Sequence, residues 1–445
     1  MDVNKYRALV EKNTDKILEV ERYIWAHPET GYNEWGTTEY LAKIFEQAGY
    51  VLTRPDDITG FYTDIDTGRP GPKILIMGEM DSLASPTHFA AVNGKAHACG
   101  HNTQCAALVG VALALKEPGA LDGLSGSIRL MAVPAEELIE VEQREKLREK
   151  GVIRYLTGKP EYLRRGYMDD VDMAYMVHAA VAKDYTFFLC GANGCITKEI
   201  TYLGASSHAG GCPEKGINAL YAANLGLSAI NSLRETFRDD DHVRVHPIIT
   251  KGGSAVNIIP AETGISTFVR GASMENIAET NRKVNRALAA GALAIGAGVR
   301  LLDRPGYAPL NNDPTLSAVA EECAAQLAGR ENVNFDFPWE CASTDMGDLS
   351  CVMPVFHAHV AGSDGTEHGD NYCVTDPMTC CVLSAAFMTA TAGALLCDGA
   401  AKAKEVVAKA KPKYKSKEEY FAAIDAFSYN GELISYDDKG AIVKY

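Results

Sequence analysis

The sequence of 445 residues lacks several features that mark well-known classes of protein. No uninterrupted apolar stretch is long enough to cross a bilayer, and the N-terminus lacks the apolar segment of a signal peptide. Positive charge is in deficit, because the formal net charge is -15 and the acidic residues are spread along the chain. These absences argue against nucleic acid and membrane as partners, and they predict a cytoplasmic protein.

Two chemical motifs are also missing. The twelve cysteines show no regular spacing, and several, such as Cys323 and Cys397, lie in apolar helical patterns where a reduced, buried thiol is usual. We therefore expect no disulfides. The sequence contains no Gly-x-Ser-x-Gly motif, which argues against a serine hydrolase. Cys99 is the one cysteine whose neighbours indicate chemistry.

Cys99 lies in the stretch His97-Ala-Cys-Gly-His-Asn102. An apolar run that predicts a buried strand, 73–78, precedes it, and a predicted helix, 103–115, follows it. Cys99 and His101 are one residue apart, so on an extended or tightly turned backbone both side chains can point to the same side, as two ligands of one metal ion must. A loop between a strand and a helix is also where open α/β sheets keep their chemistry.

Other predicted strands end in polar side chains that could complete a metal site. Asp81 comes just after the buried strand, where a carboxylate must be paired or must orient another group. Glu136 and Glu137 follow a predicted strand at 127–133. Adjacent carboxylates can mark an exposed helix start, but metal-assisted hydrolysis needs one carboxylate on the metal and one to take a proton from water. His178 ends a further predicted strand.

The last ligand is left open among three histidines. His368 lies in the polar turn 365–372, whereas His357 and His359 alternate along a predicted strand at 355–360. The densely charged stretch 138–170 predicts a solvated helix and loop.

The length of the chain exceeds what one hydrophobic core usually serves, which predicts two domains. A β-α-β-β-α order between about 190 and 297 suggests a small sheet with helices on one face, inserted as a domain of its own. Its polar landmarks are His208, Asn257 and Arg270, which lie in turns or at a strand end. The pattern alone does not decide whether they contact a substrate.

Seven motifs together resemble one family. They occur in the order found in the co-catalytic metal hydrolases of the M20 peptidase/amidohydrolase family, which includes aminoacylases and hippurate hydrolases. The closest similarity is to the branch of p-aminobenzoyl-glutamate hydrolases and β-alanyl-dipeptidase-like proteins. The motifs are His97-Ala-Cys-Gly-His-Asn102, Pro134-Ala-Glu-Glu137, His178, Gly204-Ala-Ser-Ser-His208, Asn257-Ile-Ile-Pro260, Ser343-Thr-Asp-Met-Gly347 and Glu367-His368.

The resemblance implies a fold and a set of roles. The fold is α/β: a di-metal hydrolase domain (1–188 and 306–445) with a central mixed sheet flanked by helices, plus an inserted smaller α+β lid or dimerisation domain (189–305). The cofactors are two divalent metal ions, with Zn²⁺ favoured and Mn²⁺ or Co²⁺ as alternatives. The implied metal ligands are Cys99, bridging both ions, His101, Glu137, His178 and His368. The other implied roles are Glu136 as general base, Asp81 orienting a ligand, His208 stabilising an oxyanion in a partner protomer's site, and Asn257 and Arg270 binding the substrate's carboxylate.

The implied function is a metal-dependent amidohydrolase that cleaves the amide bond of an N-acyl amino acid or a dipeptide-like substrate with a free carboxylate. The role of His208 requires at least a homodimer. A broader exopeptidase or carboxypeptidase of the same fold and a non-catalytic metal-binding protein are the alternatives. Retention of Glu136 argues against the latter, because metal binding alone needs no spare base.

Two departures from the family pattern concern specificity. Leu138-Ile-Glu-Val-Glu-Gln143 and the charged stretch after it replace a glycine-rich turn, and this segment leaves directly from Glu137. Asn102 and Gln104 stand where the auxin-conjugate hydrolases of the family usually have Asp and His, which separates this chain from that branch.

Overall fold

The computed structural model describes residues 2–438 and 440–444. The chain divides into two compact units. Unit 1 comprises Met1–Gly191, Asn311–Trp339 and Asp348–Lys417, and unit 2 comprises Ala192–Leu310, Glu340–Gly347 and Glu418–Tyr445. Each unit has its own sheet, described separately below.

Unit 1 is built on a seven-stranded mixed sheet with the order β1-β5-β2-β6-β14-β7-β13. The four central strands are parallel, and β1 and β7 run antiparallel to their inner neighbours. Ile74 to Glu79 of β2 are all buried, as expected of a strand covered on both faces. The strands are β1 (Phe61–Asp66), β5 (Ser127–Val133), β2 (Lys73–Glu79), β6 (Met173–Ala180), β14 (Val355–Ala361), β7 (Phe187–Leu189) and β13 (Val333–Asn334).

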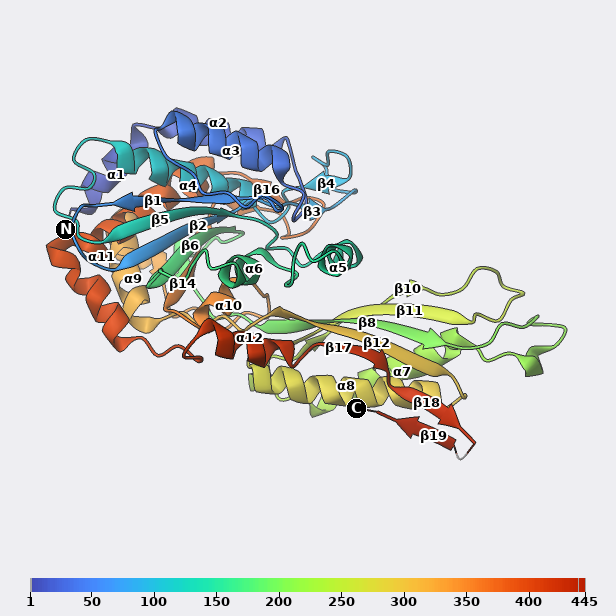
Figure 1. Ribbon diagram of the computed structural model, residues 1–445. Coiled ribbons are helices and arrows are strands. Elements are labelled where there is room, and N and C mark those ends of the chain that lie inside the picture. The colour runs from blue at the N-terminus through green and yellow to red at the C-terminus, as the bar shows by residue number, and fades with distance from the viewer. Residues whose placement is uncertain (1, 439, 445) are drawn as a thin grey trace. The chain divides into compact units, whose positions relative to one another are not determined.

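Helices flank this sheet (Figure 1). The Ala- and Leu-rich α4 (His101–Lys116) packs on β2 and β6 and is contacted in turn by α2 (Thr14–Trp25) and α11 (Ser384–Lys409). The predicted central mixed sheet flanked by helices is therefore confirmed. The other helices of unit 1 include α1 (Val3–Glu11), α3 (Trp35–Gln47), α5 (Val141–Glu149), α6 (Gly158–Arg164) and α9 (Pro314–Ala328).

One helical segment, Met378–Lys409, is long and apolar enough to cross a membrane, contrary to the sequence prediction that no such stretch exists. Its apolar window is 89% buried inside the protein. The segment packs on α4 and α9, and most of its alanines, with Phe387 and Met388, belong to the core of unit 1. Its hydropathy is thus that of a core helix, which needs apolar side chains all round.

Unit 2 contains an antiparallel sheet with the order β10-β11-β8-β12-β17. The helices α7 (Ala219–Leu233) and α8 (Met274–Leu293) pack on each other and against β8 and β11 (Figure 1). This is the α+β arrangement that the sequence predicts for the inserted domain. The strands are β8 (Gly194–Leu203), β9 (Arg244–Val245), β10 (Ile248–Lys251), β11 (Glu262–Gly271), β12 (Gly298–Tyr307) and β17 (Tyr429–Glu432).

The C-terminal tail differs from the sequence-based boundaries. The sequence predicts that all of 306–445 lies in the first domain, whereas residues 306–310, 340–347 and 418–445 belong to unit 2. The reason is strand pairing, because β17 adds to the edge of the sheet by pairing with β12. The remaining short elements are β3 (Leu83–Ala84), β4 (Lys95–Ala96), α10 (Met346–Ser350), β15 (Ser363–Asp364), β16 (Cys373–Val374), α12 (Lys417–Asp425), β18 (Ile434–Asp437) and β19 (Gly440–Val443).

Two further sequence expectations meet different outcomes. All twelve cysteines are free thiols, as predicted. The charged stretch 138–170 does form helices, α5 and α6, but it is not simply solvated. Arg144, Lys159 and Glu161 are each at most 1% exposed. A charge pattern cannot distinguish these buried groups from their exposed neighbours, because the partner that stabilises a buried charge can lie elsewhere in the chain.

Candidate metal centre

The carboxyl ends of three parallel strands of unit 1 supply most of the polar side chains. Glu79 ends β2 and Asp81 follows it, Glu136 and Glu137 come shortly after β5, and His178 lies near the end of β6. Because these neighbouring strands are parallel, their carboxyl ends meet at one edge of the sheet. The sheet therefore collects residues that are about 100 positions apart in the sequence.

The Cys99-Gly100-His101 turn sits at the start of α4. Gly100 has a left-handed backbone with φ of 84° and caps the helix. A Cβ atom at this position would lie 2.4 Å from the hydroxyl of Tyr372. Glycine is thus required both for the turn and for the close approach. The turn places Cys99 just before the helix and His101 as its first residue.

Cys99 is the centre of a cluster of ligand-type atoms. Its Sγ lies 3.3 Å from Nε2 of His178 and 3.4 Å from Nε2 of His368. Nε2 of His368 lies 3.3 Å from Oε1 of Glu137. Two groups suited to hold a metal ion result, namely Cys99 with His101 and His178, and Cys99 with Glu137 and His368. The thiol belongs to both groups.

The three histidines that the sequence left in competition are separated by the fold. His368 lies in the loop between β15 and β16, where its backbone N–H donates to the carbonyl of Ala98 at 2.9 Å. His357 and His359 lie on β14. The His359 ring stacks on Phe188, and His357 is buried, with both ring nitrogens lacking a hydrogen-bond partner among the described residues. Only His368 joins Cys99 and Glu137.

Asp81 is fully buried and forms hydrogen bonds with residues of the cluster. Its carboxylate accepts hydrogen bonds from the backbone N–H groups of Glu136, at 3.1 Å, and Glu137, at 2.9 Å. Its carbonyl oxygen lies 2.9 Å from Nδ1 of His101. This contact fixes the imidazole so that Nε2 faces the cluster.

The electrostatics suit a cation. Burial and the charge of Glu137 both raise the pKa of the Cys99 thiol. His178 and His101 lower it by more than this, so the net pKa is about 6, below the ordinary value of a thiol. The Glu137 carboxylate raises the pKa of His368 to about 11. The thiolate and carboxylate are balanced by protonated imidazolium groups, and a divalent cation would take the place of these protons. The set of thiol, imidazole and carboxylate donors, with Glu79 3.2 Å from Nε2 of His101, fits such an ion.

Glu79 and Lys159 lie next to the cluster, and neither was predicted from the sequence. Glu79 has one carboxylate oxygen 3.2 Å from Nε2 of His101 and forms an ion pair through the other with Lys159 of α6. Gln104 donates to Glu79 at 2.8 Å. Glu79 could have been predicted from the sequence, because it ends the buried strand that Asp81 follows. Lys159 gave no signal within its charged segment.

The other predicted site residues belong to unit 2. His208 and Asn257 are exposed and lie on adjoining loops, joined by a hydrogen bond from the Ala209 N–H to the Asn257 carbonyl at 2.9 Å. Arg270, near the end of β11, donates from Nη1 to the hydroxyl of Ser343 at 3.0 Å. Ser343 opens the Ser-Thr-Asp-Met-Gly motif, so the fold brings together two of the segments that the sequence singled out.

Comparison with known proteins identifies the class. The model of peptidase family M20/M25/M40 matches residues 75–392, which is most of the chain and spans every candidate ligand. The chain therefore belongs to this family of amidohydrolases and peptidases, whose members act on acyl-amino acids and dipeptides. It is a hydrolase of that class.

The individual relatives share little sequence identity with this chain. The chain is 27% identical over 374 residues to the Xaa-Arg dipeptidase of Mus musculus, covering 82% of this chain and 80% of that protein. It is 28% identical over 281 residues to one of the p-aminobenzoyl-glutamate hydrolase polypeptides of Escherichia coli, covering 60% of this chain and 53% of that protein. A dinuclear metal-binding M20 peptidase of Bacillus subtilis shares the fold, with a TM-score of 0.64, 20% identity and coverage of 87% and 99%.

Proposed function

We propose that this chain is a metal-dependent amidohydrolase that cleaves the amide bond of an N-acyl amino acid or a dipeptide-like substrate bearing a free carboxylate. The observation that carries the proposal is the pair of ligand groups that share the Cys99 thiol, with the carboxylate of Glu136 beside them. Two groups with a common thiol suit two ions held close together. Hydrolysis needs in addition a carboxylate that can accept a proton from water.

The proposed ligands are Cys99, His101, Glu137, His178 and His368. Thiolate and imidazole favour Zn²⁺, while the carboxylate would also accept Mn²⁺ or Co²⁺. When bound, such ions would acidify a water molecule and polarise the scissile carbonyl. Asp81 contributes by holding His101 and the backbone of the glutamate pair in place.

Glu136 is the proposed general base. Its Oε2 lies 3.9 Å from Nε2 of His101, so its carboxylate faces the atoms that would hold the ions. It would take the proton from the attacking water and return it to the amine that leaves. The side chain is only 8% exposed, so few bulk water molecules compete for this proton.

Three residues of unit 2 are proposed to bind the substrate. Arg270 is suited to the substrate's carboxylate, because its planar guanidinium can bind both oxygens, and its bond to Ser343 holds it in place. Asn257 would assist it, and His208 would stabilise the oxyanion in the site of a partner protomer. Residues 1–188 and most of 306–417 would then form the catalytic domain, and 189–305 the lid or dimerisation domain.

A homodimer is supported by the exposed surface of unit 2. β10 is at the edge of its sheet, and all four of its residues are exposed. An unprotected apolar edge strand tends to pair with another chain. Further exposed apolar side chains lie in the loop that follows β10 and on α7. The set comprises Ile248, Ile249, Val256, Ile258, Tyr221 and Leu225. We propose that a second copy covers this surface in the cytoplasm.

The test compares wild type with Glu136→Gln for metal content and hydrolysis of p-aminobenzoyl-glutamate, hippurate, acetylated amino acids and β-alanyl dipeptides. We expect about two ions per chain in both proteins, following the two-metal mechanism, and loss of turnover by roughly 10²- to 10⁴-fold in the variant. Cys99→Ser serves as the ligand control, and full metal content in that variant would refute the ligand set. Metal without turnover of any substrate would favour the binding-protein alternative.

A dipeptidase of broader specificity is the second candidate. The relative with the wider coverage is named an Xaa-Arg dipeptidase, and it matches 82% of this chain. The same panel extended by dipeptides with a C-terminal Arg or Lys decides between the two, because the reaction is identical and only the accepted side chain differs.

A further inference from the structure

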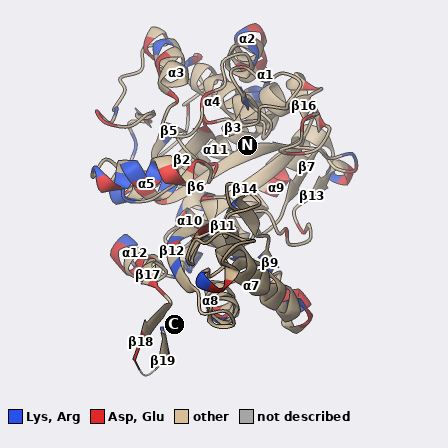
Figure 2. Cartoon of the chain, turned by 90° about the vertical axis from the view of Figure 1, so that its right-hand side faces the viewer, with Lys and Arg blue, Asp and Glu red and all other residues tan. Residues whose placement is uncertain are grey.

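The segment 141–165 is an island of positive charge in an acidic protein. It carries eight Lys or Arg residues and four Glu residues, whereas the whole chain has a net charge of -15. Figure 2 shows that α5 carries several Lys and Arg positions together with Glu positions. Local charge opposite to that of the whole chain raises the local concentration of anions.

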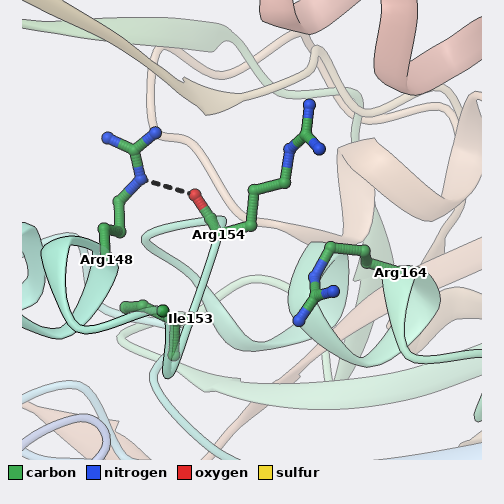
Figure 3. Close-up of a pocket in the computed structure, with 5 residues that line it drawn as sticks. Arg148, Ile153, Arg154 and Arg164 are labelled. Atoms are coloured by element: carbon green, nitrogen blue, oxygen red, sulfur yellow. Dashed lines mark hydrogen bonds between the residues drawn. The ribbon is translucent and has the colours of Figure 1, made fainter.

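A cavity of about 250 Å³ lies within this segment, lined by Arg148, Gly151, Ile153, Arg154 and Arg164 (Figure 3). We call it the arginine pocket. Three of its five lining residues are arginines, contributed by α5, by the following loop and by α6. Its volume is below that of a typical drug-sized site, so it suits a small group.

The walls of the arginine pocket are held in place. Nε of Arg148 donates to the carbonyl of Arg154 at 2.6 Å (Figure 3). The buried carboxylate of Glu161 accepts from the backbone N–H of Arg154, at 2.9 Å, and from Nε of Arg164, at 3.1 Å. These contacts hold the guanidinium groups of Arg148 and Arg164 and the backbone of Arg154. A guanidinium group that is already positioned loses less conformational entropy when it binds an anion.

A second observation points the same way. Arg144, one helical turn before Arg148 on α5, is 1% exposed. Its Nη1 donates to the carbonyl of Leu156 at 2.7 Å, whereas its Nε and Nη2 have no hydrogen-bond partner among the described residues. Arg144 and Arg148 both donate to carbonyl groups of the loop between α5 and α6. The buried guanidinium of Arg144, with two nitrogens that lack a hydrogen bond, adds positive potential to this loop.

We infer that the arginine pocket binds a small anionic ligand through a carboxylate or phosphate group. Arginine recognises both groups because its parallel N–H donors match two oxygens of the anion. The anion could be a second carboxylate of the substrate, in which case the inference rests on the proposed function, or it could be a free anion. Both sources share the same recognition chemistry.

The first experiment is calorimetric titration of inorganic phosphate, and separately of glutarate, into the full-length, metal-loaded protein. Arg154→Ala and Arg164→Gln remove pocket cations, and Lys146→Ala is the matched control because it removes one exposed cation from α5 outside the pocket. We expect at least a tenfold weaker affinity in the two arginine variants and an unchanged affinity in the control, since a charged hydrogen bond is lost. Equal affinity in all four proteins, or no binding to wild type, would overturn the inference.

The second experiment separates the two sources of the anion. KM is measured for N-acetylglutamate and N-acetylalanine with wild type and Arg154→Ala. A rise in KM for the glutamate substrate alone assigns the pocket to the substrate's second carboxylate, whereas unchanged KM values with weakened phosphate binding assign it to a free anion. If neither substrate is hydrolysed, the proposed function fails, and the phosphate titration still decides the pocket.

Discussion

Lys159 and Glu79 form an ion pair in which both side chains are at most 1% exposed, and this pair lies directly beside His101. Burial raises the pKa of the Glu79 carboxyl, but Lys159 and the neighbouring histidines lower it below its ordinary value. The charged segment after Glu137 thus supplies a residue that lies beside the candidate metal centre. It provides the cation that balances a carboxylate of the central sheet.

Lys159→Met is expected to destabilise the protein by about 3–5 kcal/mol, because it leaves a buried carboxylate without its partner. Urea unfolding measures the loss. The double variant Glu79→Gln with Lys159→Met should recover a large part of it, since neither charge then remains buried alone. Lys146→Met, which breaks only an exposed pair with Glu142, should cost less than about 0.5 kcal/mol. Equal losses for the two single lysine variants would contradict this account.

Alkylation of Cys99 by iodoacetamide in the metal-free protein should accelerate as the pH rises through about 6, the pKa set by its histidine neighbours. The thiolate is the reactive form, so the rate should level off below the pH at which an ordinary thiol with a pKa of about 8.5 would. Mass spectrometry of the Cys99 peptide follows the reaction. Adding Zn²⁺ should protect the thiol, and a rate insensitive to metal would argue against Cys99 as a ligand.

Glu34 predicts a pH dependence of stability in the metal-free protein. Burial raises the pKa of the Glu34 carboxyl to about 8, and the charge of Asp81 is the second cause of this rise. Between the unfolded value near 4.5 and about 8, the folded state keeps a proton that the unfolded state releases, so the free energy of unfolding falls as the pH rises.

Glu34→Gln removes this contribution. Urea midpoints of the variant and of wild type are compared between about pH 5 and pH 8. The midpoint of the variant should increase relative to that of wild type as the pH rises, because only wild type carries the buried acid that titrates in this range. Asp57, whose pKa is lowered by Arg165, provides the opposite control, because Asp57→Asn should not gain stability over this range. A constant difference between Glu34→Gln and wild type would show that Glu34 does not titrate there.

Arg270→Lys tests the recognition of the substrate's carboxylate. Lysine keeps the charge but loses the two-pronged geometry, so KM should rise by about 10- to 100-fold with little change in kcat. Arg244→Lys is the matched control, because Arg244 lies opposite Arg270 in the β9–β11 pair and donates only to the carbonyl of its own neighbour, Val243, among the contacts described. An equal rise in both variants would indicate a general effect of the sheet rather than recognition.

The sequence by itself determined what is local. Cys99 and His101 are separated by one glycine, and Glu136 and Glu137 are adjacent, so any backbone that positions one member also positions the other. The strand patterns before Asp81, Glu137 and His178 likewise predicted that these residues lie at or just after the ends of strands. The structure then showed that these strands are parallel neighbours, which brings their carboxyl ends together.

Only the tertiary structure decided what depends on partners far apart in the chain. It placed His368, rather than His357 or His359, beside Cys99 and Glu137, because the loop that carries His368 bonds to the backbone of Ala98, next to Cys99. It paired Lys159 with Glu79 across 80 positions, and it moved residues 418–445 to unit 2 through the β12–β17 pair. Burial and pairing of this kind come from contacts between distant segments, which periodicity and composition do not record.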